Sequence, residues 1–285
     1  MVSRKDITVN DGAIGDRELN IEKLQADIGS GYTQKIVKRL HDFAYIPMPV
    51  LEEIKSNALS ENWGKNLQAL KKYLAVNVAW SVEQGRVTFG EDQFYLTAGS
   101  LQTRYGTPLY LVFMAGDEEG KAPWKLIKGG PHINAPSLPS APEIPTGLQM
   151  PKGAEIVMQH DHMLKDNADR VEFLKDAPPV AQMCAISGAI QWSINRSLQL
   201  PYWYFGSMNY LVPLYLRDRE DITAAPDLVA PIQITNDQIL VRTVLEPHMP
   251  YSNARVGVKR HDQLPSWMLR TWNDHADVEA NGEEQ

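Results

Sequence analysis

Residues 199–216 read QLPYWYFGSMNYLVPLYL, and this stretch decides the fold class. It contains two runs rich in aromatic and branched apolar residues, 199–205 and 209–216, separated by a short turn. Two further runs of the same kind follow at 227–235 and 238–247. Because turns or short loops join these runs, without regular crossover helices, the sequence predicts strands of a largely antiparallel sheet.

The chain before this sheet begins with helical patterns. Residues 19–62 contain three helix-like pieces, and from Trp63 to Val82 large apolar residues recur at spacings of three and four. That spacing is typical of one helix face, and Gly85 is a natural residue to end the helix. N-terminal helices followed by strands predict an α+β fold in which helices pack on a largely antiparallel sheet.

Shorter patterns connect these two parts. Three β-rich runs lie at 86–90, 93–99 and 108–116, and a further strand is predicted at 154–162. Six prolines between residues 131 and 153 exclude a helix or a central strand there, so we expect a long ordered surface loop.

The distribution of apolar residues also predicts the domain organisation. Residues 1–18 have little apolar content and are expected to form a flexible N-terminal arm. Residues 19–273 are expected to form a single α+β domain. Residues 274–285 carry five acidic and no basic residues, which predicts a disordered acidic tail.

Composition restricts the partners of the protein. The formal net charge is −7, which argues against bulk electrostatic binding to nucleic acid. Residues 239–270, however, hold five basic and two acidic residues, a local excess that suits a small anion or the end of a nucleic acid and equally fits ordinary surface variation. One cysteine, no long apolar run and no secretory signal predict a cytoplasmic protein without a membrane partner.

The common catalytic signatures do not occur in the sequence. No stretch matches the glycine-rich phosphate loops, the hydrolase nucleophile elbow, paired CxxC cysteines or the HExxH zinc motif. His160 and His162 would share one face of a strand, but no third or fourth ligand is evident, so we expect no metal site. No cofactor is assigned.

A first group of polar residues lies at 159–170, QHDHMLKDNADR. Asp166 could cap a helix and pair with Arg170 four residues later, which would explain both residues structurally. Asn167 and Arg170 at a helix start could instead bind a phosphate, with His162 or Asp166 moving a proton. The sequence leaves both interpretations open.

A second group lies at 248–257, HMPYSNARVG. Tyr251 offers a stacking face, Asn253 a donor and an acceptor, and Arg255 a planar fork for a phosphate or carboxylate. The stretch could also be a simple turn, or Arg255 could be buried against a carboxylate such as Asp166. We expect a site, with Arg255 facing a cleft shared with residues 166–170.

Gly99 marks a third place of interest, because a glycine between two β-rich runs allows a bulge or a close backbone approach. The hydroxyls of Thr97, Ser100 and Thr103 lie nearby without a visible base, so a serine nucleophile is not expected.

Six segments occur here in the order and rough spacing of the domain of unknown function 3825 family. They are DFAYIP, ALSENW, LTAGSL with PLYLVF, HDHMLKDNADR, LPYWYFGSMNYLVPLYL, and TVLEPHMPYSNARV with SWML. The sequence thus resembles that bacterial and fungal family over about residues 38–269. The resemblance implies an enzymatic domain associated with RNA-binding modules and points to eight positions: Gly99, His162, Asp166, Asn167, Arg170, Tyr251, Asn253 and Arg255.

The sequence departs from the family pattern at a few of these segments. Thr97 and Ala98 stand where Asn and Thr are usual, and Pro250 and Ser252 replace Ala and Asn. If the replaced Asn were catalytic, this member would bind a ligand without turning it over.

We therefore expect an RNA- or nucleotide-directed enzyme, with phosphoester chemistry as the natural reaction class. His162 and Asp166 would be catalytic, and Gly99, Asn167, Arg170, Tyr251, Asn253 and Arg255 would hold the substrate. One alternative is a non-catalytic module that binds a nucleotide or an RNA end through the same residues. Another is a structural interaction protein in which these residues are caps and buried ion pairs.

Overall fold

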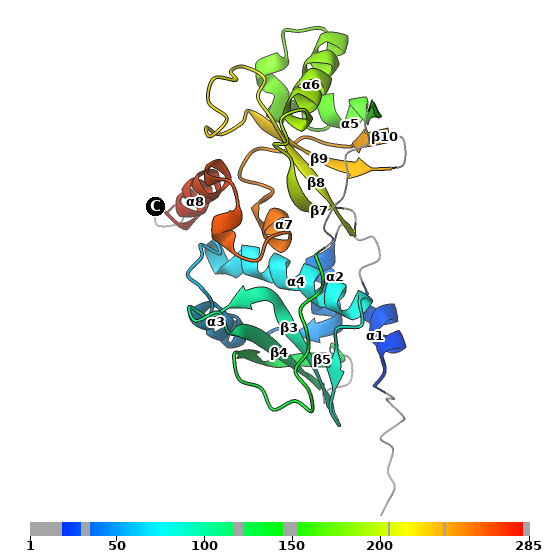
Figure 1. Cartoon of the computed structure of the whole chain (residues 1–285), viewed down its shortest axis with the longest axis vertical. Helices are drawn as coiled ribbons and strands as arrows, with labels where there is room; N and C mark the ends of the chain where they lie inside the picture. The colour runs from blue at the N-terminus through cyan, green and yellow to red at the C-terminus, as the bar shows by residue number, and fades with distance from the viewer. Residues whose placement is uncertain are drawn as a thin grey trace, which may run out of the picture.

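Two β-sheets with helices between and around them make up the fold (Figure 1). The computed structural model describes residues 19–29, 35–116, 122–144, 153–204, 206–235 and 238–281. The predicted arm at residues 1–18 lies outside the described residues, as do residues 282–285.

The first sheet has the strand order β1-β5-β4-β3-β2. Its strands are antiparallel neighbours except for β1 and β5, which are parallel. Their bounds are β1 (Ala44–Tyr45), β2 (Thr88–Phe89), β3 (Gln93–Gln102), β4 (Pro108–Ala115) and β5 (Trp124–Gly130).

Four helices precede or cover this sheet: α1 (Ile21–Ile28), α2 (Ile36–Phe43), α3 (Met48–Asn57) and, after the short helix η1 (Lys65–Leu67), α4 (Gln68–Glu83). Helix α4 is buried along most of its length, because β3, α2 and α7 pack around it. It ends as the sequence predicts: Gly85 adopts φ +65°, while Gly85 N–H donates to Val82 O (3.0 Å) and Arg86 N–H to Ser81 O (2.8 Å). These two bonds satisfy carbonyls at the helix end.

The second sheet has the order β6-β10-β9-β8-β7. Its neighbours are antiparallel except for β6 and β10, which are parallel. The four strands predicted from residue 199 onward are confirmed. The bounds are β6 (Glu155–Met158), β7 (Leu200–Tyr204), β8 (Ser207–Leu214), β9 (Leu228–Ile234) and β10 (Gln238–Val241).

Both faces of the second sheet are covered by apolar side chains. Because side chains alternate along a strand, Val212 and Ala230 belong to a core beneath α6 (Pro179–Ile194), while Leu211 and Val229 belong to the first core. On the first-core side Trp203 meets Trp80 of α4, with ring centroids 5.2 Å apart. The first core therefore extends from the first sheet through α4 to the second sheet.

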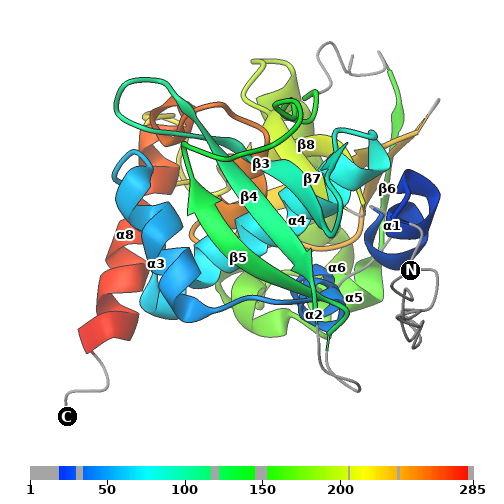
Figure 2. The same cartoon turned by 90° about the horizontal axis from the view of Figure 1, so that it is seen from below.

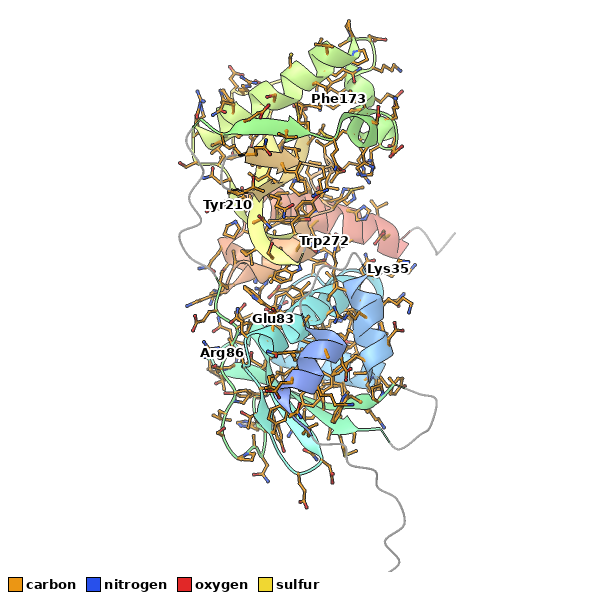
Figure 3. All side chains as sticks on the ribbon, turned by 90° about the vertical axis from the view of Figure 1, so that its right-hand side faces the viewer. Lys35, Glu83, Arg86, Phe173, Tyr210 and Trp272 are labelled. Atoms are coloured by element: carbon orange, nitrogen blue, oxygen red, sulfur yellow. The ribbon has the colours of Figure 1, made fainter. Side chains whose placement is uncertain are left out.

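The remaining helices lie on different sides of the second sheet. Helix α5 (His160–Leu164) and η2 (Ala168–Leu174) accompany α6, whereas α7 (Tyr251–Val256) packs on α4 and β7. After η3 (His261–Gln263), α8 (Ser266–Asn281) lies on the same side of the molecule as α3 in both views (Figures 1 and 2). Figure 3 places Trp272 of α8 between the two sheets and Phe173 of η2 near the far end.

The predicted α+β class is confirmed, with the strands divided between two mixed sheets. One local prediction is wrong: residues 160–164 form a helix, so the strand predicted over 154–162 ends at Met158. Residues 251–256 form a helix, which removes the alternative of a simple turn. Asp166 does not cap the following helix, because η2 begins after Asn167.

The disordered acidic tail predicted for residues 274–285 is also wrong for its first part. Residues 274–281 continue α8. Ala276 is buried in the first core, and Glu279 Oε2 accepts a 2.7 Å hydrogen bond from Gln68 Nε2. The buried face of α8 therefore stabilises a helix whose acidic composition is typical of a segment exposed to solvent.

We predict that truncation after Asn273 lowers the free energy of unfolding by on the order of 2 kcal/mol, because it removes Ala276 and the Gln68 hydrogen bond. Truncation after Asn281 is the matched control and should change little. Urea denaturation of both proteins measures the difference, and equal curves would show that the end of α8 contributes no stability.

We also predict that residues 19–273 unfold in a single cooperative transition, because the first core contains residues from both sheets. Limited proteolysis within residues 131–153 should leave the two fragments associated on a sizing column. Recovery of two separately folded halves would contradict a single domain.

Candidate functional site

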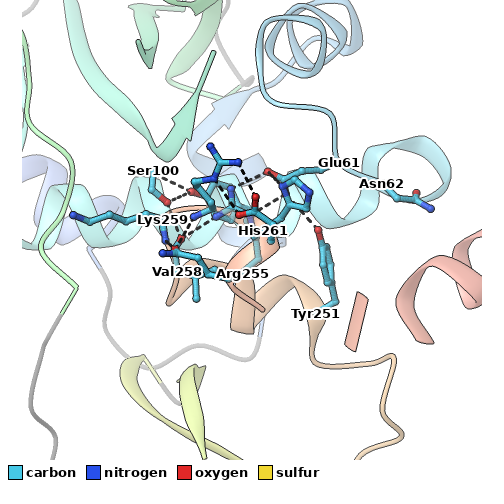
Figure 4. Close-up of polar contacts among 12 residues, drawn as sticks. Glu61, Asn62, Ser100, Tyr251, Arg255, Val258, Lys259 and His261 are labelled. Carbon is cyan, nitrogen blue, oxygen red and sulfur yellow. Dashed lines mark hydrogen bonds and ion pairs between the residues drawn. The ribbon is translucent and has the colours of Figure 1, made fainter. Parts of the chain in front are cut away.

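A buried ion pair joins α7 to the segment between α3 and η1. Arg255 donates from Nε to Glu61 Oε2 (2.9 Å) and from Nη2 to Glu61 Oε1 (2.8 Å), and the two side chains are 2% and 1% exposed. Arg255 Nη1 donates to Val258 O (2.9 Å). The guanidinium therefore makes these hydrogen bonds to acceptors inside the protein (Figure 4).

Two tyrosines complete the surroundings of this pair. The Arg255 guanidinium lies 5.2 Å from the ring centroid of Tyr73, and the Tyr251 hydroxyl donates to Glu61 Oε2 (3.3 Å). Burial opposes the charge of Arg255, but its electrostatic interactions with Tyr73 and its bond to Glu61 outweigh this effect and raise the pKa of Arg255. Burial, assisted by the charge of Glu61, raises the pKa of Tyr251, so its hydroxyl stays a donor.

His261 of η3 lies at the edge of the pair. Its Nδ1 is 3.7 Å from Glu61 Oε1, is itself buried, and has no hydrogen-bond partner among the described residues. The side chain is 27% exposed, so other atoms of the residue face the solvent. Figure 4 shows the imidazole beside the Glu61 carboxylate. This is the one ionisable ring of the cluster that both contacts Glu61 and reaches water.

Gly99 allows β3 to approach this cluster closely. Gly99 has φ +59°, and an added Cβ would lie 2.4 Å from Asn77 Oδ1 and 2.6 Å from Tyr73 Oη. The next residue, Ser100, donates from its backbone N–H to Tyr73 Oη (2.9 Å) and from Oγ to Val258 O (3.0 Å). The pairing of β3 with β4 also shifts between Thr97 and Gln102. Both roles predicted for Gly99, a bulge and a close approach, are present.

The other predicted group lies on the surface beyond the second sheet. His162 Nδ1 is 3.0 Å from Asp166 Oδ2, and both side chains are at least half exposed. Asn167 Nδ2 donates to His162 O (2.7 Å), and Arg170 Nη1 donates to Val244 O (3.0 Å). These bonds fold the segment 160–170 onto itself and onto the chain that follows β10.

The prediction that Arg255 shares a cleft with residues 166–170 is therefore wrong. Arg255 pairs with Glu61 and not with Asp166, and the two predicted groups lie on opposite sides of the second sheet. Asn253 belongs with Arg255 on α7, where Nδ2 donates to Trp203 O (2.8 Å) and the buried Oδ1 has no described partner. The structure brings together Gly99, Tyr251 and Arg255, and separately His162, Asp166, Asn167 and Arg170.

The sequence did not single out Glu61, Tyr73 or His261 as site residues. Glu61 lies 194 positions before Arg255, and no local spacing in the sequence predicts an ion pair between residues so far apart. Its one signal was its place in ALSENW, a segment shared with the family.

Comparison with known families gives a clear result. The model of the family described as Domain of unknown function (DUF3825) matches residues 54–264, which is most of the chain. The chain belongs to the DUF3825 family. The region shared with the DUF3825 family contains Glu61, His261 and both predicted groups, whereas α1, α2 and α8 lie outside it. No curated protein and no solved structure matches the chain.

Two further features of the described residues bear on the class of site. No cluster of three or more His, Cys, Asp or Glu side chains in these residues is arranged to hold a metal ion. None of the described helices has the length and apolar character to cross a membrane. A cavity of about 490 Å³ is lined by residues of α1, α2 and the start of β5, and Glu61 is not among them.

We predict that Arg255→Ala lowers the free energy of unfolding by roughly 3–5 kcal/mol, because it leaves Glu61 buried without its partner. The double change Glu61→Leu with Arg255→Met should cost less than Arg255→Ala alone. Arg260→Ala, which breaks an exposed pair with Asp262, is the matched control and should have little effect. Equal losses in Arg255→Ala and Arg260→Ala would contradict the structural role of Arg255.

Proposed function

We propose that the protein is an enzyme that performs acid–base chemistry on phosphoesters of RNA or nucleotides, with His261 as the proton-transfer residue. Glu61 orients His261, and Arg255 and Tyr251 hold Glu61. The observation that carries the proposal is the 3.7 Å approach of His261 Nδ1 to a buried carboxylate that is fixed by three other hydrogen bonds.

A carboxylate beside Nδ1 selects the imidazole tautomer whose proton lies on Nδ1, which leaves Nε2 as the free base. In this role Nε2 accepts a proton from an attacking hydroxyl or water and returns it to the leaving oxygen. The approach of 3.7 Å is long for a hydrogen bond, and such contacts commonly tighten only when a substrate is bound.

The rigidity of Glu61 favours this pair over the exposed one. A catalytic group must be held near its productive geometry, and Glu61 is fixed by α7 and packed beneath η3. His162 and Asp166 are closer to each other, at 3.0 Å, but both extend into solvent from a short helix.

The neighbouring cations favour an anionic substrate. Lys259 and Arg260 directly precede His261 on the exposed segment before η3, and Arg260 is paired with Asp262. Lys259 has no side-chain ion pair or hydrogen bond among the described residues, so its charge is available to attract a phosphate. Arg255, which we first expected to hold the phosphate, instead organises the catalytic pair.

A second candidate keeps His162 and Asp166 as the catalytic residues, because their 3.0 Å contact is the geometry of a proton-transfer pair. A third assigns the same surface to non-catalytic binding of a nucleotide or an RNA end. The three differ in which histidine matters and in whether any substrate is turned over.

We predict that His261→Asn lowers the rate of turnover of the RNA or nucleotide substrate by at least about 100-fold, because general acid–base groups contribute about 10²–10⁴-fold. The partly exposed side chain leaves the melting temperature nearly unchanged. His162→Asn is the matched control and should retain activity. The assay is single turnover on end-labelled RNA and on nucleotides.

The opposite result, loss with His162→Asn and retention with His261→Asn, would transfer the catalytic role to His162 and Asp166. Binding without turnover in the unmodified protein would support the non-catalytic module. Neither binding nor turnover with any of these substrates would contradict the proposed substrate class.

A further inference from the structure

A row of stacked rings attaches α8 to the chain before α7. The rings of His248 and His275 have centroids 3.9 Å apart and planes inclined by 25°. Trp272, one turn before His275 on α8, stacks on Tyr251 with centroids 4.9 Å apart and planes inclined by 1°. Two of the four rings are imidazoles, so this contact contains ionisable groups that an apolar contact lacks.

The charged groups facing the two imidazoles are a pair of glutamates. His248 Nδ1 lies 3.6 Å from Glu246 Oε2, and His275 Nε2 lies 3.3 Å from Glu279 Oε1. Glu279 is also bound by Gln68, which positions it from the side of α4. Each ring thus has one carboxylate, and the rings face each other.

Burial lowers the pKa of His248, the neighbouring His275 lowers it further, and the charges of Glu246 and Glu279 oppose this effect. A histidine whose pKa is lower in the folded than in the unfolded protein stabilises the fold above its unfolded value of about 6.5, and that stability is lost as the pH falls. The stacked arrangement therefore favours the uncharged form of His248.

We propose that His248 and His275 form a proton-sensitive contact that holds α8 on the 246–251 segment at neutral pH and releases it when both rings are protonated. One imidazolium can stack on a neutral imidazole. Two imidazolium rings at 3.9 Å repel each other, and the two glutamates, both partly exposed to water, offset only part of that repulsion.

Release of α8 has a consequence at the Glu61 cluster. Trp272 covers the face of Tyr251, whose hydroxyl donates to Glu61 Oε2 (3.3 Å). Loss of the Trp272 ring frees Tyr251 and weakens one of the bonds that fix the carboxylate beside His261. This second step rests on the proposed function, whereas the release itself does not.

Amide hydrogen exchange of the full chain at pH 7.5 and pH 5 tests the release. After correction for intrinsic exchange rates, we expect the amides of residues 266–281 to exchange about tenfold faster at pH 5 than at pH 7.5. His248→Phe keeps a ring against His275 but cannot be protonated, so in that variant α8 should remain equally protected at both pH values.

His162→Asn, which removes a histidine from the surface beyond the second sheet, is the matched control and should behave like the unmodified protein. The proposal is overturned by equal α8 protection at the two pH values in the unmodified protein. It is also overturned by the same tenfold change in His248→Phe, since groups other than this pair would then be responsible. Turnover is measured in a separate assay. If the proposed substrate class is wrong, the hydrogen-exchange result still tests the release of α8.

Discussion

The pairing of Arg255 with Glu61 is the constraint on which the centre of the molecule depends. A charge buried to this degree is tolerated only with its partner in place, so α7 cannot pack on α4 unless the segment before η1 delivers Glu61. Arg255 Nη1 and the hydroxyl of Ser100 both donate to Val258 O, which brings β3 into the same arrangement. One ion pair thus fixes parts of the chain that are far apart in sequence.

The same pair determines what chemistry the site can perform. Because Arg255 is 2% exposed and bound to Glu61 and Val258, it is not placed to bind a substrate phosphate from solvent. Gly99 is part of this arrangement, since a side chain there would displace Tyr73 and Asn77. Tyr251 and Arg255, which the DUF3825 resemblance implied as substrate contacts, are therefore buried beneath the surface.

Local patterns in the sequence predicted the local structure well. The apolar spacing from Trp63 to Val82 and the glycine at residue 85 predicted α4 and its end, and the runs after residue 199 predicted β7 to β10, because both signals arise within a few neighbouring residues. The end of α8 was mistaken for a disordered tail because a single buried alanine, Ala276, is invisible in an acidic composition. For the candidate site, the sequence pointed to Arg255 and Gly99, whose substrate-binding roles stay predictions. Glu61 and His261 could not be predicted, because they come from segments whose meeting depends on the tertiary fold.

The extent of the first core has a consequence for the synthesis of this protein. That core begins at Leu24 and ends at Ala276, and it includes Tyr251, Trp267 and Trp272 near the end of the chain. A nascent chain emerging from a ribosome cannot complete this core until Ala276 has been added, although the first sheet and α4 are already available. During that interval the side of α4 that packs on α7 is uncovered, and this is a stage at which a chaperone would meet exposed apolar surface.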